Sequence, residues 1–365
     1  MAAASSSTID ATQQVRFCRS PDGVRLAYAS HGTGPPLVVV SCWLSHLQYD
    51  WQSPVWRHFL EDLGAITTLV RYDDRGFGLS DWNVTDFSLD ARLRDLEAVI
   101  DGVGLDRFAI MGMSGNSPVA VGYAARHPER VTRLIMYGGW AGWPQPPRRD
   151  DETNEAAYQA MVRAGWARPD PLFRRVFTNI FIPGATEQQM SWFDDLQRMS
   201  TSTENMLAAR QARRATNVAA LLPEIRVPTL VLHARGDMAV DLEHARALAA
   251  AIPGAKLTAL DSRNHILLAD EPAWRVFLAE VAAFMEPDRA QAARAPDGDV
   301  AALSARERGV LHLAAEGLSN EEVAQRLSLS VRTVERHLSN AYLKLGISGK
   351  SARTAAVARL LRGHG

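Results

Sequence analysis

The sequence predicts an α/β fold with a mostly parallel sheet, followed by a small unit built of helices alone. Three observations lead to this prediction. Short apolar runs alternate with amphipathic helical stretches as far as about residue 285, the pattern of a sheet with helices on both faces. Residues 144–222 interrupt this alternation with helical signals and no convincing strand, and residues 303–365 carry helical signals only. The length of 365 residues agrees with two domains.

The strands and helices of the first unit follow one another in a regular order. A hairpin is predicted where Pro21-Asp22-Gly23 separates residues 14–19 from residues 24–30. The later strands are expected as continuous apolar runs at 37–42, 66–72, 108–113, 133–137, 229–233 and 256–260, as in strands buried on both faces. The intervening helices are expected at 55–63, 89–103, 119–127, 242–252 and 272–284.

Helix breaks and a polar stretch set the domain boundaries. Pro-Gly and Arg-Pro-Asp-Pro breaks predict several short helices at about 144–222, placed as a lid over the carboxyl edge of the sheet. Residues 286–302 are polar and contain Pro287, Pro296 and Gly298, as is typical of a linker. The predicted domains are therefore residues 14–285, which include the lid, and residues 303–365.

The composition excludes several classes of protein. A hydrophobic share of 47% and a charged share of 22% exclude wholesale disorder. Cys18 and Cys42 indicate neither a disulfide framework nor a zinc site, and we expect both to be small buried hydrophobes. No metal or cofactor site is predicted. The N-terminal residues lack a secretory pattern and no apolar run reaches the ~18 residues of a membrane helix, so a cytoplasmic protein without membrane contact is expected.

Capping residues in the C-terminal unit indicate where three helices begin. The pairs Ser304–Glu307 and Ser319–Glu322 have capping-box spacing, and Ser330 can cap a third helix. The short gap before Ser330 suits the tight turn of a helix-turn-helix. At about 100° per residue, the third helix places an apolar stripe on one side: Val334, Leu338, Ala341, Tyr342 and Leu345. Arg332, Arg336, Ser339 and Asn340 lie on the opposite face, with Thr333 and Glu335 at its margins.

This polar face leaves two interpretations open. It is either a solvated helix surface or a surface that enters the major groove, where Arg and Asn side chains read base edges. The whole stretch LSARERGVLHLAAEGLSNEEVAQRLSLSVRTVERHLSNAYLKLGI, residues 303–347, resembles a LuxR-type helix-turn-helix domain. The resemblance implies double-stranded DNA as a partner, a recognition helix at about 331–345, and a fourth helix at 351–361 that makes a homodimer.

The resemblance also implies roles for single residues. Thr333, Glu335, Arg336 and Ser339 would face bases or phosphates. Arg332, Asn340 and Lys344 would be positioned for the DNA backbone. Many members of the family carry a basic residue at this position, where this chain has the acidic Glu335. Charge supports the resemblance: residues 303–365 hold ten basic and five acidic side chains, a net charge of +5, while the rest of the chain sums to −6 and the total is −1. The near-neutral total therefore conceals a basic unit.

The first unit contains an approximate nucleophile elbow. Gly112-Met113-Ser114-Gly115-Asn116 follows an apolar run and precedes a helix, close to the G-x-S-x-G pattern. The chemistry requires a sharp turn that lifts the hydroxyl of Ser114 clear of the sheet, and the helix N-terminus favours a developing oxyanion. Asn116 replaces the last Gly of the pattern. Asn tolerates strained backbone better than most residues.

Two later residues complete a possible catalytic triad. Asp237 follows the predicted strand at 229–233, and His265 follows the strand at 256–260. The order Ser114, Asp237, His265 and the placement of each at the carboxyl end of a strand fit nucleophile, orienting acid and base. The alternative is that Asp237 caps a helix and His265 is an ordinary loop residue.

The surrounding motifs resemble those of α/β-hydrolases. Residues 72–80, YDDRGFGLS, are similar to the D-x-R-G-x-G-x-S loop, and residues 123–131, YAARHPERV, to the end of the elbow helix. The resemblance covers about residues 14–285 and implies the α/β-hydrolase fold with a helical lid. Where hydrolases carry His-Gly-x, this chain has Ser41-Cys42-Trp43. The amides of Trp43 and Gly115 would form the oxyanion hole, and Asn116 and Trp140 would lie at the ligand.

Aromatic residues gather in loops at the same predicted edge. These loops hold Trp43, Trp51, Trp56, Trp82, Trp140 and Trp143. They suit an apolar ligand cavity, although ordinary packing is the alternative. Three functions follow: a transcriptional regulator that senses a small apolar molecule, an active esterase or lactonase joined to a DNA-binding domain, or a hydrolase fold without activity that mediates dimerisation or docking.

Overall fold

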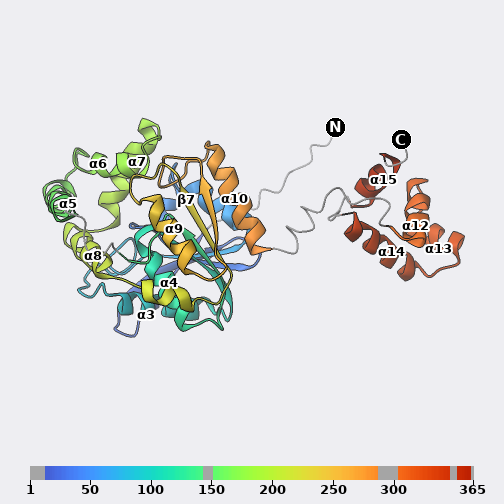
Figure 1. Ribbon diagram of the computed structural model, residues 1–365, viewed down its shortest axis with the longest axis horizontal. Coiled ribbons are helices and arrows are strands. Elements are labelled where there is room, and N and C mark those ends of the chain that lie inside the picture. The colour runs from blue at the N-terminus through green and yellow to red at the C-terminus, as the bar shows by residue number, and fades with distance from the viewer. Residues whose placement is uncertain (1–12, 143–150, 287–302, 346–351, 363–365) are drawn as a thin grey trace. The chain divides into compact units, whose positions relative to one another are not determined.

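The computed structural model describes residues 13–142, 151–286, 303–345 and 352–362, and separates into two compact units after Val281 (Figure 1). Of the predicted linker, 286–302, all but Glu286 lies outside the described residues. Within the described helices, none is long and apolar enough to cross a membrane.

The larger unit is built on an eight-stranded sheet with the order β1-β2-β4-β3-β5-β6-β7-β8. The hairpin of β1 (Gln14–Arg19) and β2 (Arg25–His31) is antiparallel, and β2 pairs antiparallel with β4 (Thr68–Tyr72). All other pairings are parallel. They join β3 (Pro36–Val40), β5 (Phe108–Met113), β6 (Val131–Tyr137), β7 (Thr229–Ala234) and β8 (Lys256–Leu260). The predicted fold class is confirmed.

Helices cover both faces of this sheet. The apolar sides of α3 (Leu89–Val103), α4 (Ser117–Arg126) and α9 (Leu242–Ala251) share one core cluster with the central strands. On the other side, Phe59 of α2 (Arg57–Ile66) packs its ring against Trp274 and Phe277 of α10 (Pro272–Met285). A short helix, α1 (Leu47–Trp51), lies beside the sheet and was not predicted. Both cysteines are free; Cys42 is buried as expected, but Cys18 is only partly buried.

The predicted lid is a group of helices that lies at one end of this unit in Figure 1. It consists of α5 (Asp151–Gly165), α6 (Arg174–Phe181), α7 (Glu187–Ser200), α8 (Thr203–Ala215) and the 3-10 helix η2 (Ala219–Glu224). Three of these helices are longer than the short ones predicted. Residues 144–150, the start of the predicted lid, and Trp143 lie outside the described residues.

The smaller unit is formed by α12 (Ala305–Ala315), α13 (Asn320–Leu327), α14 (Val331–Lys344) and α15 (Ala352–Arg362). Both predicted capping boxes are present, Ser304 with Glu307 and Ser319 with Glu322. The turn between α13 and α14 begins at Ser328, whose φ of +52° is left-handed. The helices enclose one core, to which α12, α13, α14 and α15 all contribute buried apolar side chains.

Candidate active site and DNA-binding helix

Ser114 sits on a strained turn between β5 and α4. Its φ of +50° is one of two left-handed values among the described non-glycine residues. Such a conformation costs an L-residue ~1–2 kcal/mol, and it is found where the surrounding structure enforces it. The enforcement comes from close packing: a Cβ added at Gly112 would lie 2.8 Å from the Cβ of Ala120 and 3.0 Å from the Cα of Ser117. The small residue at 112 therefore lets α4 start directly behind the strand.

The structure brings the three predicted triad residues together. His265 Nε2 lies 2.8 Å from Ser114 Oγ, and His265 Nδ1 lies 2.6 Å from Asp237 Oδ2. All three side chains are almost fully buried. The other carboxylate oxygen of Asp237 accepts hydrogen bonds from the amides of Ala239 and Val240, at 2.8 and 3.0 Å. Asp237 is thus held by its own loop while it faces the imidazole.

Electrostatics favour a proton on His265. Burial alone lowers the pKa of this imidazole, but the adjacent Asp237 carboxylate outweighs burial and raises the pKa above its usual value of 6.5. Burial likewise acts to raise the pKa of Asp237, and the charge and hydrogen bond of His265 overcome it and lower that pKa. The Asp237 carboxylate therefore stabilises the protonated form of the His265 imidazole.

The end of β6 holds His265 in place. Tyr137 donates its hydroxyl hydrogen to the main-chain carbonyl of His265 at 2.7 Å. The next residue, Gly138, has a φ of +59°, and a Cβ there would lie 2.9 Å from the imidazole Cε1. Gly138 is thus required both for its backbone conformation and for the space that the His265 ring occupies.

Asn116 has a different place from the one predicted for it. It is fully buried, its side chain points into a polar network, and it is not among the described lining residues of the cavity. Its Nδ2 donates to the carbonyl of Cys42 at 3.1 Å and to Asp74 at 2.6 Å. Its Oδ1 accepts from Arg92 at 3.0 Å and from Arg213 at 2.9 Å. The departure from the Gly of the elbow pattern therefore supplies four polar contacts.

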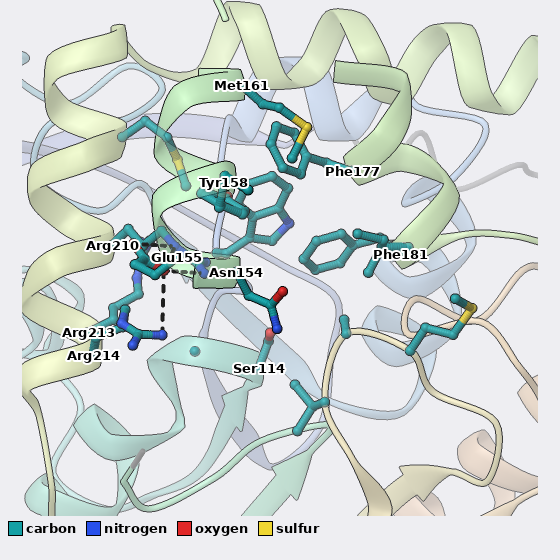
Figure 2. Close-up of a pocket in the computed structure, with 18 of the residues that line it drawn as sticks. Ser114, Asn154, Glu155, Tyr158, Met161, Phe177, Phe181, Arg210, Arg213 and Arg214 are labelled. Atoms are coloured by element: carbon teal, nitrogen blue, oxygen red, sulfur yellow. Dashed lines mark hydrogen bonds and ion pairs between the residues drawn. The ribbon is translucent and has the colours of Figure 1, made fainter. Parts of the chain in front are cut away.

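A cavity of about 470 Å³ opens above Ser114 (Figure 2). Of the residues predicted at the ligand, Trp43, Gly115 and Trp140 line it together with Ser114. Trp43 stacks on Phe181 with ring centroids 4.6 Å apart, and Phe177, Met161 and Tyr158 cover the cavity from the lid. Trp51 and Trp56, also predicted at this edge, are not among the described lining residues. Trp51 packs against His31 and Trp56 against Phe59, as the alternative interpretation expected.

The predicted recognition helix α14 has the two faces expected from its sequence. Val334, Leu338, Ala341 and Leu345 are buried in the core of the smaller unit. The exposed residues are Arg332, Glu335, Arg336, Ser339, Asn340 and Lys344, and Thr333 is half-buried. Lys344 forms an ion pair with Glu307 of α12 at 2.7 Å, so this cation already has a partner within the unit. Within the smaller unit, the polar face of α14 is exposed.

Comparison with known families places both units. The family model described as "alpha/beta hydrolase fold" matches residues 35–272. The chain belongs to the α/β-hydrolase family. The model described as "Bacterial regulatory proteins, luxR family" matches residues 301–357, so the same chain carries a LuxR-type DNA-binding domain.

Similar proteins support the hydrolase unit. A protein from Azorhizobium caulinodans named "Putative carbamate hydrolase RutD" is 29% identical over 252 residues, which cover 68% of this chain and 90% of that protein. An esterase from Exiguobacterium antarcticum has a TM-score of 0.64 at 22% identity and covers 75% of this chain and 100% of the esterase. An enol-lactonase from Burkholderia xenovorans has a TM-score of 0.60 at 21% identity, and the match covers 74% of this chain and 99% of the lactonase. The two structural likenesses show the fold.

The charged residues of the hydrolase cavity were not predicted from the sequence. Arg210, Arg213 and Arg214 of α8 line it, and Glu155 of α5 faces them. Their spacing of three and four residues puts the arginines on one face of a helix, and this signal was present in the sequence. Among the described residues, no cluster of three or more His, Cys, Asp or Glu side chains could hold a metal ion.

Proposed function

We propose that this chain is a ligand-responsive transcriptional regulator. Its LuxR-type domain binds double-stranded DNA, and its hydrolase unit binds a small molecule in the cavity above Ser114. The observation that carries this proposal is the presence, in one chain, of a DNA-binding domain and a lidded cavity of about 470 Å³. A cavity of this size suits a small organic ligand. Acting on DNA, the protein would work in the cytoplasm.

The lid is the part through which a ligand would act. Most of the side chains that line the cavity come from α5, α6 and α8, so an occupant contacts several lid helices at once. A ligand that binds one lid arrangement better than another shifts the population toward it. In a homodimer joined through α15, such a shift would change the spacing of two recognition helices, which must match half-sites ~34 Å apart.

DNA recognition is assigned to the exposed face of α14. Thr333, Glu335, Arg336 and Ser339 would face bases or phosphates, and Arg332, Asn340 and Lys344 the DNA backbone. Selection of preferred duplexes from a random pool by the full chain tests this. Arg336→Ala should weaken binding to the selected duplex by about tenfold or more, and Arg306→Ala, an exposed cation on α12, should change it little. Absence of any preferred sequence would defeat the proposal.

A second function is favoured by the triad itself: hydrolysis of an ester or lactone. Ser114 Oγ would attack the carbonyl carbon while His265 Nε2 takes its proton, and the alkoxide would face the amides of Trp43 and Gly115. Collapse of the tetrahedral intermediate would break the ester bond, with His265 returning the proton to the leaving alcohol. Water, activated by the same imidazole, would then release the acid and restore Ser114. The names of the similar esterase and enol-lactonase agree with this substrate class.

The two functions are compatible, since turnover would remove the ligand and end the signal. Hydrolysis is tested with a fluorophosphonate probe, which phosphonylates an activated serine with loss of fluoride. Labelling of the native chain and its absence in Ser114→Ala support this function. A native chain whose Ser114 stays unlabelled would rule out hydrolysis but leave ligand sensing to be judged by DNA binding.

A further inference from the structure

One wall of the cavity is cationic and the opposite part is apolar. In Figure 2, Arg210, Arg213 and Arg214 gather on one side, Phe177 and Phe181 on the other, and Ser114 lies below them. Among the described lining residues, three guanidinium groups face a single carboxylate, that of Glu155. Because the guanidinium groups outnumber the carboxylate among these lining residues, an anionic ligand suits this wall better than a wholly apolar one.

Glu155 is shared between two of these cations. It lies 2.7 Å from a terminal nitrogen of Arg210 and 3.4 Å from Arg214. The guanidinium of Arg210 also lies over the ring of Tyr158, 3.4 Å from its centroid. These contacts fix Arg210 in a defined orientation while a quarter of its side chain remains exposed. A preorganised guanidinium in a partly desolvated wall is well suited to bind a carboxylate with two parallel hydrogen bonds.

Arg213 packs against the turn that carries Ser114. Its Cδ would lie 3.3 Å from a Cβ built on Gly115, the residue after Ser114. Arg213 and Arg92 both donate to Asn116, and Asp74 lies 3.8 Å from Arg213 behind the cavity wall. Burial is the main cause that lowers the pKa of Arg213, and the neighbouring Arg92 lowers it further while Asp74 opposes the shift. An additional anion on the cavity side would therefore stabilise the charged form of this buried arginine.

We propose that the cavity takes an organic monocarboxylate: its carboxylate binds Arg210 and Arg213, and its apolar body packs against Phe177 and Phe181. A single negative charge fits better than a dianion, because Glu155 stays in the wall and repels further negative charge. This inference rests on the proposed function, since it names the class of molecule that occupies the cavity. The sequence-based expectation was a small apolar molecule, and the arginines of the wall narrow it to an amphipathic acid.

A pair of probes tests this inference: 4-phenylbutyrate and its neutral analogue 4-phenylbutanamide share an aryl chain and differ in charge. Binding to the full chain is followed by tryptophan fluorescence, because Trp43 and Trp140 line the cavity. The acid should bind at least about tenfold more tightly than the amide, as expected for charge-assisted hydrogen bonds. Equal affinities, or no detectable binding of the acid, would overturn the inference.

Variants separate charge from structure. Arg210→Gln should remove most of the preference for the acid, and Arg210→Lys should keep part of it. Glu155→Gln should have the opposite effect, because it removes a carboxylate that repels the acid. The affinity for the acid should rise at least about threefold, and the affinity for the amide should not change. Arg163→Gln removes an exposed cation on α5 that is not among the described lining residues, and should alter neither probe. A preference that survives Arg210→Gln contradicts the inference.

Failure of this inference can be told from failure of the proposed function. Misfolding would weaken both probes equally, whereas the inference requires a selective loss for the acid. If the chain prefers particular DNA sequences but shows no preference for the acid, only the carboxylate assignment is wrong. If it has no preferred DNA sequence, the proposed regulatory function fails as well, whatever the result with the two probes.

Discussion

Asn116 donates a hydrogen bond from Nδ2 to the main-chain carbonyl oxygen of Cys42 at 3.1 Å. That carbonyl and the amide of Trp43 belong to one peptide unit, and in a trans peptide they point in opposite directions. By holding the carbonyl, Asn116 fixes the direction in which the Trp43 amide points. The residue that breaks the G-x-S-x-G pattern thereby positions one donor of the proposed oxyanion hole in a loop that lacks the usual His-Gly.

Removing this contact should slow phosphonylation of Ser114. In Asn116→Asp, the two oxygens can still accept from Arg92 and Arg213, but the hydrogen bonds that Nδ2 donates to Cys42 and to the Asp74 carboxylate are both lost. We expect the rate of fluorophosphonate labelling to fall by about tenfold or more, as when an oxyanion-hole donor is disturbed. Asn116→Gly should slow labelling by the same factor. It should also lower the free energy of unfolding by roughly 1–3 kcal/mol, because buried guanidiniums lose an acceptor. Unchanged labelling in Asn116→Asp would refute the positioning role.

The backbone strain at Ser114 should appear as a difference in the free energy of unfolding between two variants. Ser114→Gly and Ser114→Ala both remove the nucleophile, but only Gly adopts the φ of +50° without a Cβ penalty. Ser114→Gly should therefore be about 1 kcal/mol more stable to urea than Ser114→Ala. Equal stabilities of the two variants would show that the turn stores no strain.

Gly138→Ala should displace the imidazole of His265. The new Cβ would lie 2.9 Å from His265, at a φ of +59°. We expect labelling of Ser114 to fall sharply and stability to drop by about 1 kcal/mol or more. Gly254→Ala is the matched control: its φ of +72° is equally unfavourable, but nothing lies within 4 Å of the new Cβ. This control should lose a similar stability and keep full labelling; a loss of labelling in both would point to a general effect of strain.

The pH dependence of Ser114 reactivity should follow His265. Because Asp237 raises the pKa of this imidazole above 6.5, the neutral base is scarce at low pH. Labelling should therefore rise with pH through a midpoint above 6.5. The same pairing contributes stability that is fully present below pH 6.5 and is lost as pH rises through the folded-state pKa. In Asp237→Asn burial dominates, so the histidine titration seen by NMR should move below 6.5; a midpoint that stays in place would contradict this.

Much of the fold was predictable because its elements carry local signals. The strand at Phe108–Met113 is a continuous apolar run, and the hairpin at Pro21-Asp22-Gly23 has turn residues between two strand-like runs. Helix α1 was not predicted, because it has only five residues and is capped by His46, which is outside the usual set of capping residues. Local signals therefore set the limits of prediction for the scaffold.

Some features of the candidate site were also predictable from the sequence, and others were not. The order of Ser114, Asp237 and His265 along the chain predicted the triad, since each follows a strand of one parallel sheet. The role of Asn116 could not be read from the sequence, because its partners Cys42, Asp74, Arg92 and Arg213 come from four separate segments. The cationic wall was missed for a related reason: the arginine spacing was visible, but only the folded lid turns that helix face toward the cavity.

The central claim is that occupancy of the hydrolase cavity changes DNA binding. Its most direct test fills the cavity covalently with an alkyl fluorophosphonate at Ser114 and compares labelled and unlabelled full chain on a duplex selected from a random pool, by fluorescence anisotropy. Ser114→Ala, treated identically, is the control. The account predicts that labelling changes the DNA dissociation constant at least about fivefold, the lower range of allosteric coupling, with no change in Ser114→Ala. Identical dissociation constants for fully labelled and unlabelled protein would contradict it.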